Sequence, residues 1–364
     1  MAPPRACGCR WWSATWFCED RVRAAHGSAA ILRVECAGRT HGFPLRDVVA
    51  QAQGPMPARV VVLSDLEGNA AFLEAALRKL AVTAADGRWT YGDGHLVVLG
   101  DSVDRGRDVF AVLWRLHSLA LEAEAAGGGV HVVLGNHEQY MLRTNPARAD
   151  HDHLHALNAM GGYQRAFGAD TVIGHWLRKQ PVLLRLGDVL FAHAGISPQV
   201  AQSGLSLEQV NAAMREYWNA PSSQRERSAA FDAVLGPAGL TQYRGYFRAM
   251  EGKYARASGD DVQRALDRFG ASRIVVAHTI VDKVTPMFDG RVFAVDVNDD
   301  EAQPQVLVFE DGVARIVDIG IGRLLGDRPA RRLRGFSLTD ARDRAMLWAM
   351  VRDMRRLSSL PHPY

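Results

Sequence analysis

Three polar blocks, Asp65-Leu66-Glu67-Gly68-Asn69, Gly100-Asp101-Ser102-Val103-Asp104-Arg105-Gly106 and Gly135-Asn136-His137-Glu138, each follow a short apolar run of the chain. The apolar runs are residues 60–63, 96–99 and 130–134, and their length and composition predict buried strands. Open α/β sheets bind ligands at the carboxyl ends of their strands. The blocks would therefore present carboxylates, an amide and an imidazole at one edge of a sheet. Hard or borderline divalent metals prefer this mixture of oxygen and nitrogen donors.

Strands and helices are expected to alternate through the first half of the chain. Helices are predicted after Asn69 and over residues 108–126, and the second of these ends at three consecutive glycines. This alternation predicts a parallel sheet with right-handed crossovers. Further along, the pattern predicts a hairpin over residues 182–192, helices over 205–218 and 260–269, and a second group of strands at 274–277, 292–295, 306–309 and 314–317.

The order of the blocks resembles that of the calcineurin-like metallophosphoesterases, specifically their phosphoprotein-phosphatase branch. Two later segments strengthen the resemblance: Phe191-Ala192-His193-Ala194-Gly195-Ile196-Ser197-Pro198 and Val275-Val276-Ala277-His278-Thr279. Between them, Tyr243-Arg244-Gly245-Tyr246 is similar to a segment of bacterial Shewanella-like phosphatases. The resemblance covers residues 58–300. It implies an α/β fold, a four-layer sandwich of two mixed β-sheets flanked by helices.

The resemblance also implies a role for each matching residue. Two divalent metal ions would be bound, one by Asp65 and Glu67, the other by Asn136, His193 and His278, with Asp101 bridging both. A hydroxide shared by the two ions would attack the phosphorus atom. His137 would protonate the leaving oxygen and Asp104 would orient His137. Arg105 and Arg244 would hold phosphate oxygens through paired, charged hydrogen bonds.

Glu67 departs from the family pattern, which has histidine at this position. A carboxylate can replace an imidazole as a metal ligand, but it adds a negative charge. This charge favours harder ions, so Mn is the expected metal, with Mg, Fe and Zn as alternatives. The competing interpretation is that Glu67 disables one metal position. Because every other ligand position is filled, we expect a working site.

Composition limits the other classes of function. The chain has 364 residues and a formal net charge of +3, which argues against a dedicated nucleic-acid-binding protein. It has no apolar run long enough to predict a transmembrane helix. No signal-peptide pattern precedes Glu19, so a cytoplasmic protein is expected, or a periplasmic one if the true N-terminus differs. The oligomeric state stays open.

Four regions are expected along the chain. Residues 1–28 would be a poorly ordered leader, 29–57 a β-hairpin extension with a connector, 58–322 the catalytic domain, and 323–364 an Arg-rich helical tail. The hairpin would cover an edge of the main sheet. The four cysteines all lie within the first 36 residues, and their spacing does not match paired zinc ligands. His151, His153 and His155 are interpreted as part of a solvated loop beside the site.

The expected function is hydrolysis of phosphate monoesters, with a phosphorylated protein (on Ser, Thr or Tyr) or a small phosphate ester as the substrate. Two alternatives remain open. The same dinuclear site could cleave phosphodiesters or dinucleotide tetraphosphates. A site disabled by Glu67 would leave a non-catalytic module that binds metal or phosphate.

Overall fold

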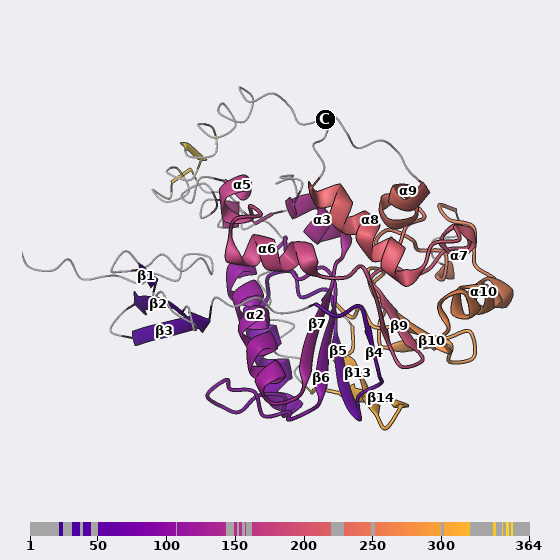
Figure 1. The fold of residues 1–364 in the computed structure, drawn as a ribbon, viewed down its shortest axis with the longest axis horizontal. Coiled ribbons are helices and arrows are strands. Elements are labelled where there is room, and N and C mark those ends of the chain that lie inside the picture. Colours follow the sequence, from indigo (N-terminus) through magenta and orange to yellow (C-terminus); the bar gives the residue numbers. More distant parts are fainter. Residues whose placement is uncertain are drawn as a thin grey trace, which may run out of the picture.

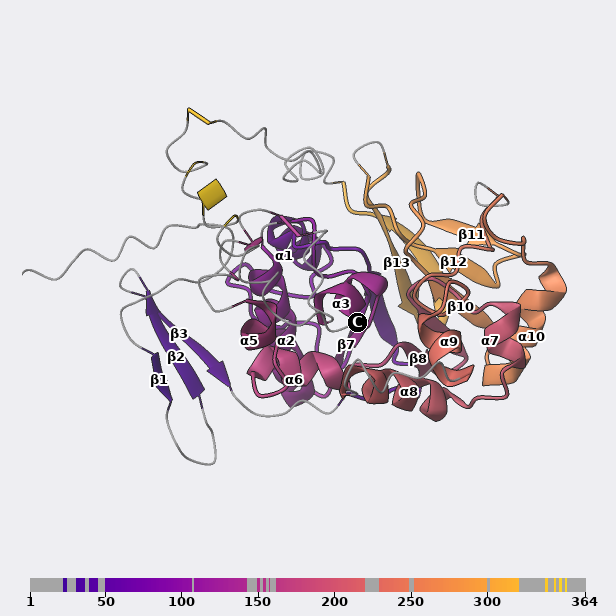
Figure 2. The same cartoon turned by 90° about the horizontal axis from the view of Figure 1, so that it is seen from above.

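The computed structural model describes residues 50–106, 108–142, 162–219, 229–248, 252–299 and 302–320, three short strands before residue 50, and scattered residues over 149–157 and 338–351. Within these residues, two mixed β-sheets pack face to face and helices cover their outer faces (Figures 1 and 2). The expected α/β four-layer sandwich is therefore confirmed.

The first sheet has five strands in the order β14-β13-β5-β6-β7. Their bounds are β5 (Arg59–Leu63), β6 (His95–Leu99), β7 (Gly129–Val133), β13 (Gln305–Glu310) and β14 (Val313–Asp318). Strands β5, β6 and β7 are parallel, whereas β13 pairs antiparallel with both β5 and β14. The three parallel strands are the three apolar runs of the sequence, so their carboxyl ends meet at one edge.

The second sheet has six strands in the order β11-β12-β10-β9-β8-β4. Their bounds are β4 (Gln53–Gly54), β8 (Leu183–Leu186), β9 (Val189–Ala192), β10 (Arg273–Val276), β11 (Thr285–Met287) and β12 (Val292–Ala294). Strand β10 pairs parallel with β9 on one side and with β12 on the other. The carboxyl ends of these three strands therefore also lie at a common edge.

The core between the two sheets follows from the two-residue period of a strand. Val60 and Val62 of β5 pack between the sheets, whereas Val61 and Leu63 face the helical layer. Across the interface, Phe191 of β9 meets an edge of the ring of Phe309 in β13, with centroids 6.3 Å apart. Because both faces of these strands are buried, the strands appear in the sequence as continuous apolar runs.

Helices form the outer layers. They are α1 (Ala70–Lys79), α2 (Val109–Ala125), α3 (Asn136–Leu142), α5 (Tyr163–Ala166), α6 (Val172–Lys179), α7 (Pro198–Gln202), α8 (Leu207–Asn219), α9 (Ala229–Leu235) and α10 (Gly259–Phe269). Helices α1 and α2 lie outside the five-stranded sheet, and α7, α9 and α10 lie on the far side of the molecule (Figure 2). The Asn69 side chain caps α1 by accepting from the backbone N–H of Phe72 at 3.0 Å, as the sequence predicts.

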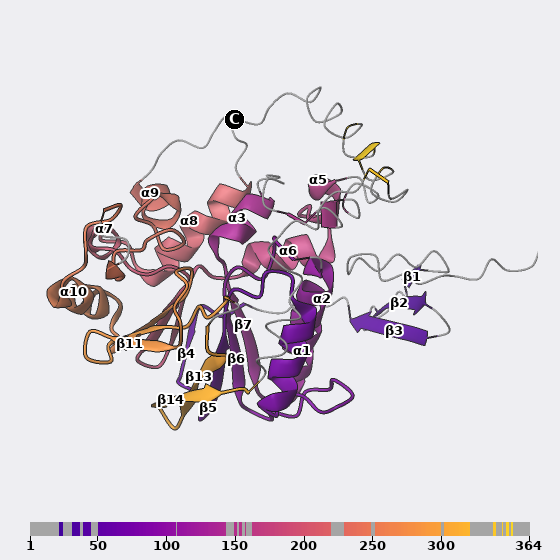
Figure 3. The same ribbon diagram turned by 180° about the vertical axis from the view of Figure 1, so that it is seen from behind.

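Two predictions about strand pairing are wrong. Strands β13 and β14 were expected in a second group with β10 and β12, but β13 instead pairs with β5 in the first sheet. The hairpin of β2 (Ile31–Cys36) and β3 (Arg39–Pro44) does not join the main sheet. It forms a separate sheet with β1 (Val22–Ala24), a strand inside the stretch expected to be a leader (Figure 3). The pairing of β13 with β5 joins residues distant in sequence, which local patterns do not encode.

Other expectations fall on residues that the structure does not describe. Most of the Arg-rich tail after residue 320 lies outside the described residues, as do three of the four cysteines. In the described part of the chain, no helix combines the length and the apolar character needed to cross a membrane.

A pair of histidines, His95 at the amino end of β6 and His131 in the middle of β7, lies away from the polar blocks. His95 Nδ1 and His131 Nε2 are 2.8 Å apart, and their rings are stacked. Burial, followed by the neighbouring His95, lowers the pKa of His131 to about 4. The folded protein therefore holds His131 neutral, whereas the unfolded chain protonates it near its ordinary value.

We predict that this pair makes the fold sensitive to acid. The stability from neutral His131 is complete above the unfolded pKa of about 6.5 and is lost as the pH falls toward about 4, by about 3 kcal/mol in total. The unfolding free energy of the parent should fall between about pH 7 and about pH 5, as measured by urea denaturation. In His131→Asn this fall should be about 2 kcal/mol smaller. The exposed His175→Asn is the control. Equal losses in the parent and the His131 variant would contradict the prediction.

Candidate metal centre

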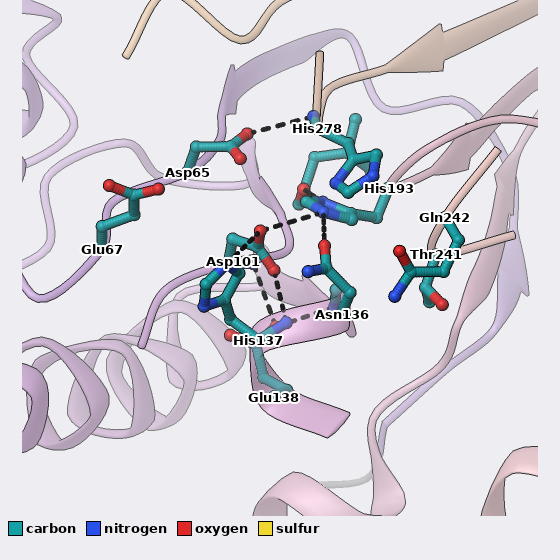
Figure 4. A network of polar contacts seen from close by, with 12 residues as sticks. Asp65, Glu67, Asp101, Asn136, His137, Glu138, His193, Thr241, Gln242 and His278 are labelled. Carbon is teal, nitrogen blue, oxygen red and sulfur yellow. Dashed lines mark hydrogen bonds and ion pairs between the residues drawn. The ribbon is translucent and has the colours of Figure 1, made fainter. Parts of the chain in front are cut away.

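Residues from both sheets meet where the parallel strands end (Figure 4). Asp65, Asp101 and Asn136 follow β5, β6 and β7 of the first sheet, while His193 and His278 follow β9 and β10 of the second. All five side chains are buried, with at most 8 % of their surface exposed. The two sheets, packed face to face, thus bring together residues that lie up to more than 200 positions apart in the sequence.

The backbone is strained at this edge. Ten described non-glycine residues have positive φ angles, and six of them belong to the predicted site: Asp65, Glu67, Asp101, Asp104, Arg105 and His278. A left-handed conformation of a non-glycine residue costs on the order of 1 kcal/mol or more, and such strain clusters at functional sites. Here these residues follow strands β5, β6 and β10.

Glu138 fixes the two central loops to each other. Its fully buried carboxylate accepts from the backbone N–H of Asp101 at 3.0 Å, of Ser102 at 2.7 Å and of Gly135 at 2.8 Å. Asp101 Oδ1 in turn accepts from the backbone N–H of His137 at 2.9 Å. A side chain at Gly135 would collide with the Asp101 carboxylate, so glycine is needed at that position. Asp101 is therefore held from several directions.

Hydrogen-bond acceptors converge beside Asp101. His193 donates from Nδ1 to the carbonyl oxygen of Leu99 at 2.8 Å, which leaves Nε2 facing the site. That Nε2 lies 3.2 Å from Asp101 Oδ2 and 3.0 Å from Asn136 Oδ1. Two oxygen acceptors and a ring nitrogen therefore point at one another. Such a group is stable only around a positive charge, either a proton on His193 or a bound cation.

His278 supplies the second ring of this group. Its Nε2 is buried and has no hydrogen-bond partner among the described residues. One ligand atom each from Asp101, His193 and His278 lies within 4.8 Å of the other two. A buried imidazole without a partner, beside a carboxylate and a second imidazole, fits a divalent metal of borderline character. The residues present therefore suit the second metal position of the expected centre.

The pKa values agree with a cation site. Burial alone would lower the pKa of His193, but Asp101 outweighs burial and raises it to about 10. Burial, followed by the nearby His193 and Arg244, lowers the pKa of His278 and keeps this ring neutral. Burial and the neighbouring Asp296 raise the pKa of Asp65 well above its usual range. In the protein without metal, one proton on His193 thus offsets the charge of Asp101.

The first metal position is less closely assembled. Asp65 Oδ2 lies 3.5 Å from the backbone nitrogen of His278, close to the second position. The Glu67 carboxylate instead lies 2.5 Å from the guanidinium of Arg105 and is set apart from the group around Asp101 (Figure 4). The structure therefore brings Asp65 to the centre but pairs Glu67 with Arg105.

His137 and Asp104 form a buried pair. His137 donates from Nδ1 to Asp104 Oδ2 at 3.0 Å, and its Nε2 lies 3.8 Å from Asp101 Oδ2. Burial opposes a charge on His137, but Asp101 and then Asp104 more than compensate and raise its pKa. The pair thus has the geometry of an imidazole oriented by a carboxylate beside the metal position.

Arg244 lies in the loop between α9 and α10. It donates from Nη1 to Thr279 Oγ1 at 3.1 Å. Its guanidinium also interacts electrostatically with Asp296, Asp65 and Asp101. Its segment is tied to α3, because Gln139 donates to Thr241 Oγ1 at 2.9 Å and Gln242 donates to the hydroxyl of Tyr140 at 3.1 Å. The predicted phosphate-binding arginine therefore lies on a loop anchored to the helix that carries His137.

Two site residues escaped the sequence analysis. Asp296, only 2 % exposed, follows β12 by two residues, just as His278 follows β10. It is the charged group with the largest effect on Asp65. The rule that polar residues after an apolar strand form the site would have found it. Glu138 was visible inside the third block, but its three backbone partners depend on the meeting of two loops.

The interpretation of the histidine run as a solvated loop is wrong for His153. This side chain is fully buried and lies against Phe110 and Tyr163, with ring centroids 5.5 Å and 6.2 Å away. Burial lowers its pKa to about 3. His151 and His155 lie outside the described residues. The polar sequence around His153 hid its contact with an aromatic cluster formed by distant residues.

Comparison with known proteins agrees with this geometry. The family model described as calcineurin-like phosphoesterase matches residues 58–282, more than half of the chain. The crystal structure of a cold-active protein-tyrosine phosphatase from a psychrophilic Shewanella species superposes with a TM-score of 0.68 at 27% sequence identity. The match covers 81% of this chain and 97% of that one.

Curated relatives match shorter stretches. Shewanella-like protein phosphatase 2 of Arabidopsis thaliana is 34% identical over 90 residues, which are 25% of this chain and 23% of that protein. A symmetrical bis(5'-nucleosyl)-tetraphosphatase of an Acidovorax strain is 36% identical over 113 residues, 29% of this chain and 34% of that protein. The chain thus spans about a quarter to a third of the length of these relatives.

We predict that Glu138 stabilises the centre through its three backbone contacts. Glu138→Gln replaces one accepting oxygen by a donor that faces backbone N–H groups, so it should destabilise the fold by about 2–4 kcal/mol. Glu74→Gln is a matched control, because Glu74 forms a partly exposed ion pair with Arg115 on helices α1 and α2. That change should cost no more than about 1 kcal/mol. Thermal unfolding of both variants measures the difference, and similar losses would argue against the role of Glu138.

Proposed function

The chain belongs to the calcineurin-like phosphoesterase family, and we propose that it is a metal-dependent phosphomonoesterase that acts on phosphorylated proteins. One observation carries this proposal. The ligand atoms of Asp101, His193 and His278 converge next to the His137–Asp104 pair. A site that gathers a cation beside an oriented imidazole is suited to hydrolysis of a phosphate ester.

The proposed metal ligands are the residues named from the sequence. Asp65, Glu67 and Asp101 would hold one divalent ion, and Asp101, Asn136, His193 and His278 the other. Two such ions supply an activated water molecule and neutralise phosphoryl oxygens. The first position is rich in carboxylates, including the nearby Asp296. This supports a hard cation such as Mn as the physiological metal.

Side chains of the protein perform the remaining steps. His137 would give a proton from Nε2 to the leaving oxygen, while Asp104 keeps Nδ1 protonated and the ring oriented. Arg105 and Arg244 would bind the non-bridging phosphate oxygens with charged hydrogen bonds. Because Asp101 and His193 are buried, little water screens them, and their electrostatic interactions with a bound ion would be strong.

The substrate class rests on the relatives. The Shewanella structure is named a protein-tyrosine phosphatase, and the Arabidopsis relative is named a protein phosphatase. These names support phosphoprotein as the substrate. A second candidate is a dinucleotide tetraphosphate, because several curated relatives are symmetrical bis(5'-nucleosyl)-tetraphosphatases. A non-catalytic module that binds metal or phosphate is the third possibility, if Glu67 disables the first position.

We predict that p-nitrophenyl phosphate hydrolysis by chelator-treated protein returns with divalent metal, most strongly with Mn. Asp101→Asn removes the charge shared by both positions and should lower the rate at least about 100-fold. Parallel assays with a phosphotyrosine peptide, bis-p-nitrophenyl phosphate and diadenosine tetraphosphate distinguish the candidate substrates. Binding of metal without turnover of any of them would favour the non-catalytic module.

A second prediction concerns His137. His137→Ala should lower kcat about 100- to 10,000-fold, because the leaving oxygen loses its proton donor. The metal content should stay that of the parent. The loss should be smallest for p-nitrophenyl phosphate, whose leaving group is stable without a proton, and larger for phenyl phosphate. The same loss for both esters would be inconsistent with His137 as the acid.

A further inference from the structure

Arg105 contacts two other residues of the site, Glu67 and His137. Arg105 Nη1 lies 2.5 Å from Glu67 Oε1, and Arg105 Nη2 donates to His137 Nε2 at 3.2 Å. The Glu67 side chain is 9 % exposed and that of Arg105 is 32 % exposed, so water screens the ion pair only partly. The guanidinium therefore connects a proposed metal ligand to the proposed general acid.

These contacts cannot persist in the working site. A divalent ion at the first position would need the carboxylate oxygens of Glu67, and a phosphate group would need the donors of Arg105. Arg105 Nη2 lies 3.2 Å from His137 Nε2 in the structure, yet this atom must face the leaving oxygen during the proposed reaction. Arg105 thus occupies two atoms that the proposed reaction needs for other partners.

The backbone fixes these residues close together. Glu67 and Arg105 both have left-handed conformations, with φ angles of 46° and 54°. The backbone N–H of Glu67 donates to the carbonyl oxygen of Asp101 at 2.8 Å, and that of Gly68 donates to Ser102 at 3.0 Å. Gly106 packs so closely on the Glu67 carbonyl that a Cβ would collide with it. Because the two loops are joined in this way, a change of partner involves only the side chains.

The surrounding charges show why this carboxylate has two possible partners. The carboxyl groups of Asp65 and Asp101 lie at the same edge as Glu67, and the negative charge of Asp101 favours any cation that approaches Glu67. The cation is Arg105 in the structure and would be a divalent ion when metal is bound. A neutral imidazole at position 67 would not attract the guanidinium in this way. The competition therefore results from the glutamate of this chain.

We propose that Glu67 is a positioning residue for Arg105 as well as a metal ligand, so that Arg105 competes with the ion at the first position for its carboxylate. The roles of metal and phosphate here rest on the proposed function. Two consequences follow. The two metal positions have unequal affinity, with the first one weaker. Binding of the weaker ion also releases Arg105, which becomes free to hold phosphate and no longer contacts His137 Nε2.

The test is a double-mutant cycle on metal binding, without turnover. Mn²⁺ is titrated into the chelator-treated full chain, and the EPR signal of the free ion reports its concentration up to the millimolar range. The proteins are the parent, Arg105→Gln, Glu67→Gln and the double variant. We expect Arg105→Gln to tighten the weaker ion about fivefold or more, because Glu67 is released. In the Glu67→Gln background the same change should have no effect.

Each other outcome has a defined meaning. If Arg105→Gln tightens the weaker ion equally in both backgrounds, Arg105 acts only as a distant positive charge and the inference is overturned. Unchanged affinity in the parent background would also overturn it. Failure of the protein to bind any Mn²⁺ would instead contradict the proposed function. Glu74→Gln and Arg115→Gln, which break an ion pair of similar length between α1 and α2, should leave Mn²⁺ binding unchanged.

A second readout separates positioning from general destabilisation. Thermal unfolding identifies any variant that no longer folds, and Arg105→Ala replaces Arg105→Gln if that protein fails. Inorganic phosphate is then titrated against Mn-loaded protein. We expect phosphate to raise the affinity of the weaker Mn²⁺ ion in the parent, and this mutual effect should shrink at least about fivefold in Arg105→Gln. An unchanged effect would show that Arg105 does not transmit the exchange.

Discussion

The Asp101 carboxylate is the group on which the rest of the site depends. One oxygen accepts from the backbone of His137, and the other faces the Nε2 of His193. A buried carboxylate is unstable unless positive charge or hydrogen bonds compensate for the lost water. Those partners come from both sheets, so the sheets must meet at their carboxyl edges for Asp101 to be tolerated. The same requirement makes the edge attractive to a divalent cation.

Holding that carboxylate in place costs local stability. Asp101 and five other residues of the site have left-handed backbones, and the fully buried Glu138 lies beside Asp101. The apolar layer between the sheets, in which β5 and β6 are buried on both faces, provides the compensating stability. Strain in the loops and regular packing in the strands are therefore two parts of one arrangement, in which a rigid scaffold fixes reactive groups that would not adopt these positions alone.

Glu67 illustrates how one residue can alter a shared site. With a histidine at this position, metal binding and phosphate binding would use separate side chains. In the proposed exchange, a glutamate pairs with Arg105 or with a cation but not fully with both, which would link the two binding events. Linkage of this kind is reciprocal: if metal binding at Glu67 strengthens phosphate binding by Arg105, phosphate must strengthen metal binding to the same extent. Membership of the phosphoesterase family therefore does not by itself describe the proposed metal binding of this chain.

The sequence alone determined the strands, the polar blocks after them and the order of the ligands, because these depend on local apolar runs and short motifs. The resemblance carried by those motifs allowed Asp101, His193 and His278, which the structure brings together, to be proposed as ligands. Only the tertiary structure decided that Glu67 contacts Arg105, that Asp296 lies beside Asp65, and that β13 pairs with β5. Each of these contacts joins residues far apart in sequence. They depend on packing of the two sheets and on the balance of buried charges, which no local pattern records.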